Sequence, residues 1–236
     1  SDSVPKNYDC IVLGFGDSVI NGGTLTDQSE VATSIIDRSL GNDARMLNVS
    51  AGSWGPDNCA AYLQKFGDFN AKLFVLVVSS HDAHDNMQFE KIVGEHPSYP
   101  NSQYPLAILE VIDRYLFPRI AAYLGKAAED DLMINKDGAG FNTGFQYFKK
   151  YSAEQGIPLL VYLHAEIEEI KAGKYNAEGQ EIISFCEKNE IPLISGLSAG
   201  ESPDLYIDQI HFNSAGQKFL ANALVDSVKG YVENCQ

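Results

Sequence analysis

The sequence predicts an α/β fold of three layers, in which a central, mostly parallel sheet of five strands lies between two layers of helices. The first observation behind this prediction is that short β-type segments alternate along the chain with segments of helical periodicity. The second is that most of the β-type segments are apolar throughout, which is typical of strands that helices cover on both faces. Such folds place functional groups on the loops that follow the carboxyl ends of the strands.

Five strands are expected, each from a short run of apolar residues. In chain order the runs are DCIVLG (9–14), ARMLNVS (44–50), KLFVLVVSS (72–80), IPLLVYLH (157–164) and IPLIS (191–195). The helices expected between and after them lie at about 27–40, 57–69, 143–155, 177–189 and 214–229. The last of these is amphipathic, because Leu220, Leu224 and Val228 share one face, and Asn213 and Ser214 begin it.

The interval from 83 to 142 interrupts this alternation. It contains one long helical segment, 105–126, which Pro118 is expected to kink or break. Its tip, 94–105, is rich in Pro and Tyr and is expected to shape a binding site or to contact a partner. The chain has 236 residues, of which 44% are hydrophobic, so it can bury one substantial core. We therefore expect a single domain, 1–236, with this interval as an insertion beside the functional site.

The charge of the chain excludes several classes of partner. It has 17 Lys and Arg against 32 Asp and Glu, which gives a net charge of −15. This charge repels phosphate backbones and anionic membrane surfaces, so we expect neither nucleic acid nor membrane as a partner. No apolar run approaches the roughly 18 residues that span a bilayer. The chain could have lost a signal peptide before Ser1, so the location is left open between cytoplasm and periplasm or exterior, and the oligomeric state is not predicted.

The four cysteines, Cys10, Cys59, Cys186 and Cys235, are widely spaced and form no C-x-x-C pair. Cys10 opens an apolar strand, and Cys59 and Cys186 lie in helical segments. Buried free thiols are therefore favoured over a disulfide framework.

The stretch GFGDSVINGG begins where the first expected strand ends. It is not a dinucleotide-binding fingerprint, because Val19 stands at the third glycine, and it is not a Walker loop, because it has no lysine. A lipase-type nucleophile elbow fails at Ile20. What remains is Gly16, Asp17 and Ser18 at the mouth of the strand, where Ser18 could begin a helical turn.

A second stretch, YIDQIHFNSAGQ, precedes the last helix and supplies partners for that serine. A serine hydroxyl is a poor nucleophile near neutral pH, so it needs a histidine to accept its proton and a third group to orient the histidine. Asp208 precedes His211 by three residues, so a single turn could bring the carboxylate to one ring nitrogen and aim the other outward. Ser18, Asp208 and His211 are therefore the candidate catalytic residues.

At these residues the chain resembles the SGNH or GDSL hydrolase family, and the resemblance runs nearly end to end. The first block matches Gly16, Asp17 and Ser18 and implies Ser18 as the nucleophile. The last block matches Asp208 and His211 and implies the rest of a triad. The resemblance implies the flavodoxin-like SGNH fold and a carboxylic ester hydrolase that acts through an acyl-enzyme, without a cofactor.

The stretch NVSAGSWGPDN resembles the family's second block, whose glycine amide helps to bind the oxyanion of the reaction. Counted from Asn48, the family glycine falls on Ser53, and Gly52 is its neighbour. Either amide could therefore serve as an oxyanion donor beside the amide of Ser18.

The third block departs from the family pattern, because the usual Gly-x-Asn-Asp is Ser-Ser-His-Asp at 79–82. His81 stands where the family's asparagine donates to the oxyanion, and a neutral imidazole of the right tautomer can still donate one N–H. His81, Asp82, His84 and Asp85 are also competent metal ligands. Their spacing matches no standard zinc signature, so no metal is expected.

The expected substrate is a small ester, with an O-acetyl group on a carbohydrate as the preferred identity. This rests on the resemblance and on Trp54 and the tyrosines near the site. Substrate contacts are expected from Asp17, Trp54 and Asp82, and from His164, which ends the fourth strand and is equally compatible with a structural role. The alternatives are a carbohydrate O-acetyltransferase with the same triad and a non-catalytic glycan-binding module, which the intact triad argues against.

Overall fold

The computed structural model of the protein describes residues 10–23, 25–41, 44–89, 93–94, 100–123 and 136–233. The chain divides into two compact units, one made of Ser1–Asn86 with Gly138–Gln236 and the other of Met87–Asp137. The interval from 83 to 142, which the sequence singles out as an insertion, contains the whole of the second unit. That the chain works as a single domain stays a prediction.

The first unit is built on a five-stranded sheet in the order β2-β1-β3-β6-β7, and all neighbouring strands are parallel. The strands are β1 (Cys10–Gly16), β2 (Ala44–Ser50), β3 (Leu73–Ser79), β6 (Leu159–His164) and β7 (Leu193–Ser195). The chain leaves β1 toward β2 on one side and later returns to β3 on the other. The carboxyl ends of β1 and β3 therefore flank a topological switch point, where parallel α/β sheets bind ligands.

Burial explains why the inner strands appear in the sequence as continuous apolar runs. Every residue of β1, β3 and β6, the three inner strands, is buried. The edge strand β2 alternates more, and β7 is half-buried throughout. Continuous apolar runs are thus found where helices cover both faces of a strand, as predicted.

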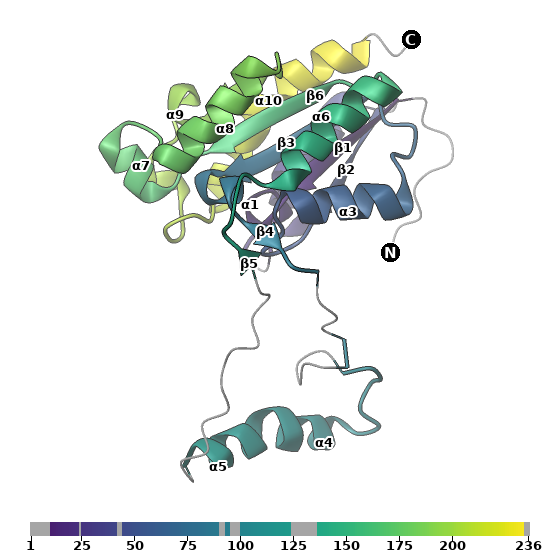
Figure 1. Cartoon of the computed structure of the whole chain (residues 1–236), viewed down its shortest axis with the longest axis vertical. Helices are drawn as coiled ribbons and strands as arrows, with labels where there is room; N and C mark the ends of the chain where they lie inside the picture. The colour runs from purple at the N-terminus through teal and green to yellow at the C-terminus, as the bar shows by residue number, and fades with distance from the viewer. Residues whose placement is uncertain are drawn as a thin grey trace. The chain divides into compact units, whose positions relative to one another are not determined.

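Helices cover both faces of this sheet (Figure 1). One apolar cluster joins the sheet to α3, α6 and α8, with Leu13 and Phe15 of β1 facing it. The other joins it to α2 and α10, with Val12 of β1 facing it. The helices of this unit are α1 (Ser18–Asn21), α2 (Ala32–Leu40), α3 (Pro56–Phe66), α6 (Thr143–Gln155), α7 (Ile167–Ala172), α8 (Ala177–Lys188), α9 (Gly196–Ala199) and α10 (Ser214–Val232). Short 3₁₀ turns lie at η1 (Gln28–Glu30), η2 (Ser80–Ala83) and η4 (Pro203–Leu205). The predicted α/β sheet flanked by helices is confirmed.

The second unit contains a helix that runs through α4 (Ala107–Val111), a π-helical turn η3 (Ile112–Leu116) and α5 (Phe117–Tyr123). Of the two outcomes expected at Pro118, a kink or a break, the break does not occur, because α5 runs through this residue. Proline removes one backbone donor and crowds the preceding turn, and the wider π turn lies immediately before it. Residues 95–99 of the predicted tip lie outside the described residues. The strands β4 (Asn86–Met87) and β5 (Lys136–Asp137) form a separate two-stranded sheet.

The cysteines correct one expectation. Cys59 and Cys186 are free and buried, as predicted, but Cys10 is disulfide-bonded. Sequence spacing does not reveal which thiols meet in space. In the described part of the chain, no helix is both long and apolar enough to cross a membrane.

Candidate active site

The candidate nucleophile sits at the carboxyl end of β1, on the first turn of α1. Asp17 caps this turn, because its Oδ1 atom accepts the amide of Val19 at 2.8 Å. Gly16 has a φ of +153°, and a Cβ at this position would lie 2.5 Å from the carbonyl oxygen of Val77. Only glycine lets the chain turn here so close to β3. The Gly-Asp-Ser sequence therefore places Ser18 at the carboxyl end of the strand.

The structure brings the predicted acid, base and nucleophile together. The Oγ atom of Ser18 lies 2.9 Å from Nε2 of His211, and Nδ1 of His211 lies 2.7 Å from Oδ2 of Asp208. A carboxylate can only accept, so Nδ1 carries a proton and Nε2 of the neutral ring is left to accept from the serine. This is the hydrogen-bond order that a general base needs in order to activate a serine hydroxyl.

Asp208 is held in its ionised form by its surroundings. Burial raises the pKa of this carboxyl, but hydrogen bonds from the amides of His211 and Ile210 and from the His211 ring lower it further, to about 2. Both amides donate to Oδ1, at 2.8 and 2.9 Å, which leaves Oδ2 for the ring. The depressed pKa contributes stability above the ordinary carboxyl range, and this contribution is lost as the pH falls toward 2.

The loop after β2 holds the second predicted block. The amide of Trp54 donates to the carbonyl of Ala51 at 3.3 Å, and Ser53 within this turn has a φ of +62°. A left-handed backbone favours glycine, and Ser53 is the position at which the family glycine falls when counted from Asn48. Gly52 and Ser53 are both exposed. Ser53 and Gly52 thus differ in backbone conformation, since only Ser53 is left-handed.

The third predicted block forms the 3₁₀ turn η2 at the end of β3. Its capping residue is Asp82, whose Oδ2 atom accepts the amide of Ser79 at 2.7 Å. Its other anchor is Glu169, which accepts the hydroxyl of Ser80 at 2.6 Å. The Nδ1 atom of His81 lies 3.0 Å from Oε1 of Glu166. The turn is therefore fixed both to its own strand and to α7.

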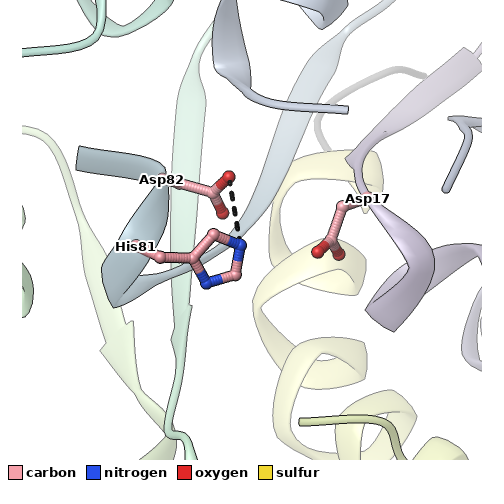
Figure 2. A group of neighbouring side chains, drawn as sticks. All are labelled: Asp17, His81 and Asp82. Atoms are coloured by element: carbon pink, nitrogen blue, oxygen red, sulfur yellow. Dashed lines mark ion pairs between the residues drawn. The ribbon is translucent and has the colours of Figure 1, made fainter. Parts of the chain in front are cut away.

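Figure 2 shows His81 with its Nε2 edge toward Asp82 and Asp17. The distance from Nε2 to Oδ1 of Asp82 is 3.9 Å, and this oxygen is buried without a hydrogen-bond partner. Burial lowers the pKa of His81, but the hydrogen bond with Glu166 and the nearby carboxylates raise it further, to about 9. Glu166 is thus the acceptor that holds Nδ1, and the raised pKa favours an imidazolium where a neutral imidazole was expected.

Asp17 and Asp82 both lie in an environment that disfavours the charged form of their carboxyl groups. Asp17 and Asp82 are 5% and 1% exposed. Burial raises the pKa of Asp82 to about 7 against the opposing charge of His81, and burial also raises the pKa of Asp17. Both carboxyls were expected to contact substrate. They are instead enclosed, one as a helix cap and the other as a turn cap, with His81 as their cation.

One ligand atom each from Asp17, His81 and Asp82 lie within 4.8 Å of one another, so these three could approach a metal ion. The distance of 3.9 Å between Nε2 of His81 and Oδ1 of Asp82 exceeds the roughly 3.4 Å that separates two ligands about 2.1 Å from a tetrahedral zinc. The four ligands considered in the sequence do not converge. His84 turns to the surface, where its Nε2 lies 2.6 Å from Oε2 of Glu181.

The remaining predicted substrate contacts differ in exposure. His164 is fully buried, and both of its ring nitrogens have partners within the protein, so the structural role left open by the sequence replaces the predicted substrate contact. Trp54 is half-buried, with its ring centroid 6.0 Å from that of Tyr62. Part of the Trp54 side chain is thus exposed.

Sequence reasoning missed three glutamates that support the site. Glu166 holds His81, Glu169 anchors η2, and Glu201 binds His164. The only local signal was the run VYLHAE at the end of β6, since Glu166 comes two residues after the strand. The partner of Glu201 lies 37 residues away, so no short pattern indicates it.

No protein-family model and no curated protein sequence matches the chain. Solved structures do match it over most of its length. A crystal structure of TesA has 15% sequence identity and a TM-score of 0.58, over 94% of this chain and 99% of that one. The acetyl xylan esterase AlAXEase has 15% identity and a TM-score of 0.54, over 92% and 99%.

A third neighbour is the lipase/acylhydrolase from Enterococcus faecalis, with 13% identity and a TM-score of 0.53, over 93% and 95% of the two chains. A member of the lipolytic G-D-S-L family from Veillonella parvula has 11% identity and a TM-score of 0.51, over 93% and 98%. Identities this low speak to the fold. The chain has the α/β fold of the SGNH or GDSL esterases.

Proposed function

We propose that the protein is a serine hydrolase that cleaves carboxylic esters through an acyl-enzyme on Ser18. The observation that carries the proposal is the hydrogen-bonded series from Ser18 through His211 to Asp208, with distances of 2.9 and 2.7 Å. Two further observations support the same reaction class. Ser18 follows β1 at the switch point of a parallel sheet, and structural neighbours include proteins named as esterases and acylhydrolases.

In the first half of the reaction, His211 accepts the proton of Ser18 as Oγ attacks the ester carbonyl carbon, and the carbonyl becomes an oxyanion. The oxyanion collapses, the C–O bond to the alcohol breaks, and His211 gives its proton to the departing alcohol. Water then attacks the acyl-serine by the same route, which releases the acid and restores Ser18. Asp208 stabilises the imidazolium that forms in both halves.

The oxyanion donors in this proposal are the amide of Ser18, the amide of Ser53 or of its neighbour Gly52, and His81. Ser18 opens a helical turn at the end of β1, and the left-handed Ser53 favours that residue over Gly52 in the second loop. His81 is cationic below a pH of about 9, and a cationic donor binds an oxyanion more strongly than a neutral one.

For the substrate we propose a small ester, with an O-acetyl group on a carbohydrate as the preferred class. Trp54 and Tyr62 place aromatic surface beside the loop after β2, and one structural neighbour is an acetyl xylan esterase. The same residues would serve an O-acetyltransferase, in which a sugar hydroxyl takes the place of water. Turnover in water without an added acceptor distinguishes hydrolysis from transfer.

A fluorophosphonate probe tests the reaction class directly. We expect one labelled serine, Ser18, identified by peptide mapping, because His211 activates only this hydroxyl among the described residues. Prior incubation with a small acetyl ester should slow the labelling. A protein that stays unlabelled while correctly folded would instead favour a binding module that keeps the fold without turnover.

The role of His81 makes a separate prediction. Replacement of His81 by Ala should lower kcat by about 10²-fold to 10³-fold with little change in KM, which is typical of one lost oxyanion donor. Replacement by Asn should restore much of the rate, since an amide N–H returns. The half-buried His84, whose ring binds Glu181, serves as the matched control, and His84→Ala should leave kcat unchanged. A raised KM with normal kcat in His81→Ala would make His81 a substrate contact instead.

The raised pKa of His81 gives this prediction a pH dependence. As the pH rises through about 9, the ring loses one proton, and Glu166 keeps the remaining one on Nδ1. The Nε2 donor is then lost, so kcat of the wild type should fall in this range while circular dichroism shows the fold intact. His81→Asn should lack this fall. A pH profile that is identical in both proteins would rule out donation from Nε2.

A further inference from the structure

A buried polar cluster lies beneath the loop that carries the candidate acid and base. Its centre is the pair of Glu201 and His164, whose side chains are fully buried and whose Oε1 and Nδ1 atoms are 3.1 Å apart. Tyr162 and Tyr206 donate their hydroxyls to Glu201 at 2.6 and 2.8 Å, and the amide of Ala165 donates at 2.8 Å. A buried carboxylate is costly unless it is paired and hydrogen-bonded, and Glu201 meets both conditions.

His164 connects this cluster to the catalytic loop. Its Nε2 atom lies 2.7 Å from the carbonyl oxygen of Ile210, while Nδ1 faces Glu201. A carbonyl and a carboxylate are both acceptors, so each ring nitrogen has to carry a proton. Burial lowers the pKa of His164, but the charge of Glu201 and the two hydrogen bonds raise it above its ordinary value. The ring is therefore a doubly donating imidazolium.

The peptide group between Ile210 and His211 is held from both sides. Its carbonyl accepts from His164, and its N–H donates to Oδ1 of Asp208 at 2.8 Å. The same Asp208 carboxylate holds Nδ1 of His211 through its other oxygen. The orientation of this one peptide plane thus sets where the carboxylate can lie, and through it the direction in which Nε2 of His211 points.

The ring of His164 is itself fixed by packing. Tyr206 stacks on it, with centroids 5.3 Å apart and planes 21° apart, and Phe212 meets it edge-on at 4.5 Å. Tyr206 and Phe212 form an isolated antiparallel bridge that closes the base of the catalytic loop. The donor to Ile210 therefore has little freedom to move, unlike a histidine at the rim of a site.

We propose that His164 is a positioning residue, which acts through the peptide between Ile210 and His211 to hold His211 in register with Ser18. This role rests on the proposed ester hydrolysis at Ser18. It requires the Nε2 donor in particular, since Nδ1 contacts only the buried cluster.

Two substitutions distinguish the hydrogen bond made by Nε2 of His164 from the one made by Nδ1. In His164→Gln the side-chain amide nitrogen reaches the place of Nε2 and can still donate to Ile210. In His164→Asn the amide nitrogen reaches only the place of Nδ1, so the bond to Glu201 remains and the bond to Ile210 is lost. Both variants are neutral and leave Glu201 without its cation, so their melting temperatures should fall by similar amounts.

We expect His164→Asn to lower kcat by about 10²-fold at unchanged KM, because small displacements of a catalytic group have effects of this size. His164→Gln should stay within about tenfold of the wild type. Rates are taken well below each melting temperature and divided by the folded fraction. The downfield proton resonance of the His211 Nδ1–H group should persist in His164→Gln and broaden in His164→Asn. Equal kcat values in the two folded variants would make His164 a purely structural residue.

If neither variant folds, Glu201→Gln provides the test. A glutamine amide facing Nδ1 leaves His164 neutral with its proton on Nε2, so the bond to Ile210 and most of kcat should remain. A folded Glu201→Gln enzyme with a 10²-fold lower kcat would contradict the proposal. Ser18→Ala in the same assay separates the two proposals: activity that survives it ends the proposed function, whereas its loss with equal His164 variants ends only the positioning role.

Discussion

Replacement of Ser18 by Ala is expected to abolish the hydrolysis of p-nitrophenyl acetate, with a loss of at least about 10⁴-fold in kcat. The hydroxyl is the atom that forms the acyl-enzyme, and without it His211 has no nucleophile to activate at 2.9 Å. The melting temperature should stay within a few degrees, because the lost hydroxyl is only part-buried and contributes little to the core.

Ser198→Ala is the matched control, since Ser198 is exposed on the short helix α9. It should hydrolyse the ester and react with a fluorophosphonate as the wild type does. Full activity in folded Ser18→Ala would show that a different group attacks the ester. A loss of activity together with a large fall in melting temperature would point to damage of the α1 turn instead, and fluorophosphonate mapping of the wild type would then decide.

The fold could be predicted because its inner strands carry little except apolar residues. β1, β3 and β6 are buried along their whole lengths, and each was recognised within two residues of its bounds. The short helices α7 and α9 were not predicted. A helix of one or two turns shows too little periodicity to be distinguished from a loop, and tertiary packing decides its conformation.

The candidate triad could be predicted for a related reason, since both of its motifs follow a recognisable boundary. Ser18 comes two residues after a buried strand, and His211 comes shortly before a capped amphipathic helix. Parallel topology then brings the loops at the carboxyl ends of the strands to one edge. The residue types and their positions relative to strands and helices can be read from the sequence. The contact between Ser18 and His211, which are 193 residues apart, appears only in the folded chain.

The surroundings of the site were harder to predict, because they depend on which side chains are enclosed. His164 ends a strand, and the strand pattern does not tell whether its last residue faces the solvent or the core. Its burial follows from Glu201, which supplies a counter-charge from a distant loop. The charge state of His81 likewise depends on Glu166, 85 residues away. Electrostatic partners of this kind leave no periodic signal in a sequence.

Asp208→Asn is expected to lower kcat by up to roughly 10⁴-fold, because it moves the proton of the neutral His211 ring from Nδ1 to Nε2. The side-chain oxygen of the substituted amide would still accept the backbone amides of Ile210 and His211, so its NH₂ group would face Nδ1 of the ring. A donor at Nδ1 forces the proton onto Nε2, and a protonated Nε2 cannot accept from Ser18. The loop should keep its conformation while the base is disabled.

Asp208→Ala distinguishes this tautomer effect from the simple loss of a carboxylate. Alanine leaves Nδ1 to water, so His211 can keep either tautomer, and we expect Asp208→Ala to be faster than Asp208→Asn despite removing more atoms. Asp204→Asn is the control, since Asp204 is also exposed and its carboxylate accepts the hydroxyl of Ser202. An Asp208→Asn enzyme with a normal rate would mean that His211 is oriented without its carboxylate. The remaining restraint would then be the peptide that His164 holds, so combining Asp208→Asn with His164→Asn would show whether the two restraints act on the same imidazole.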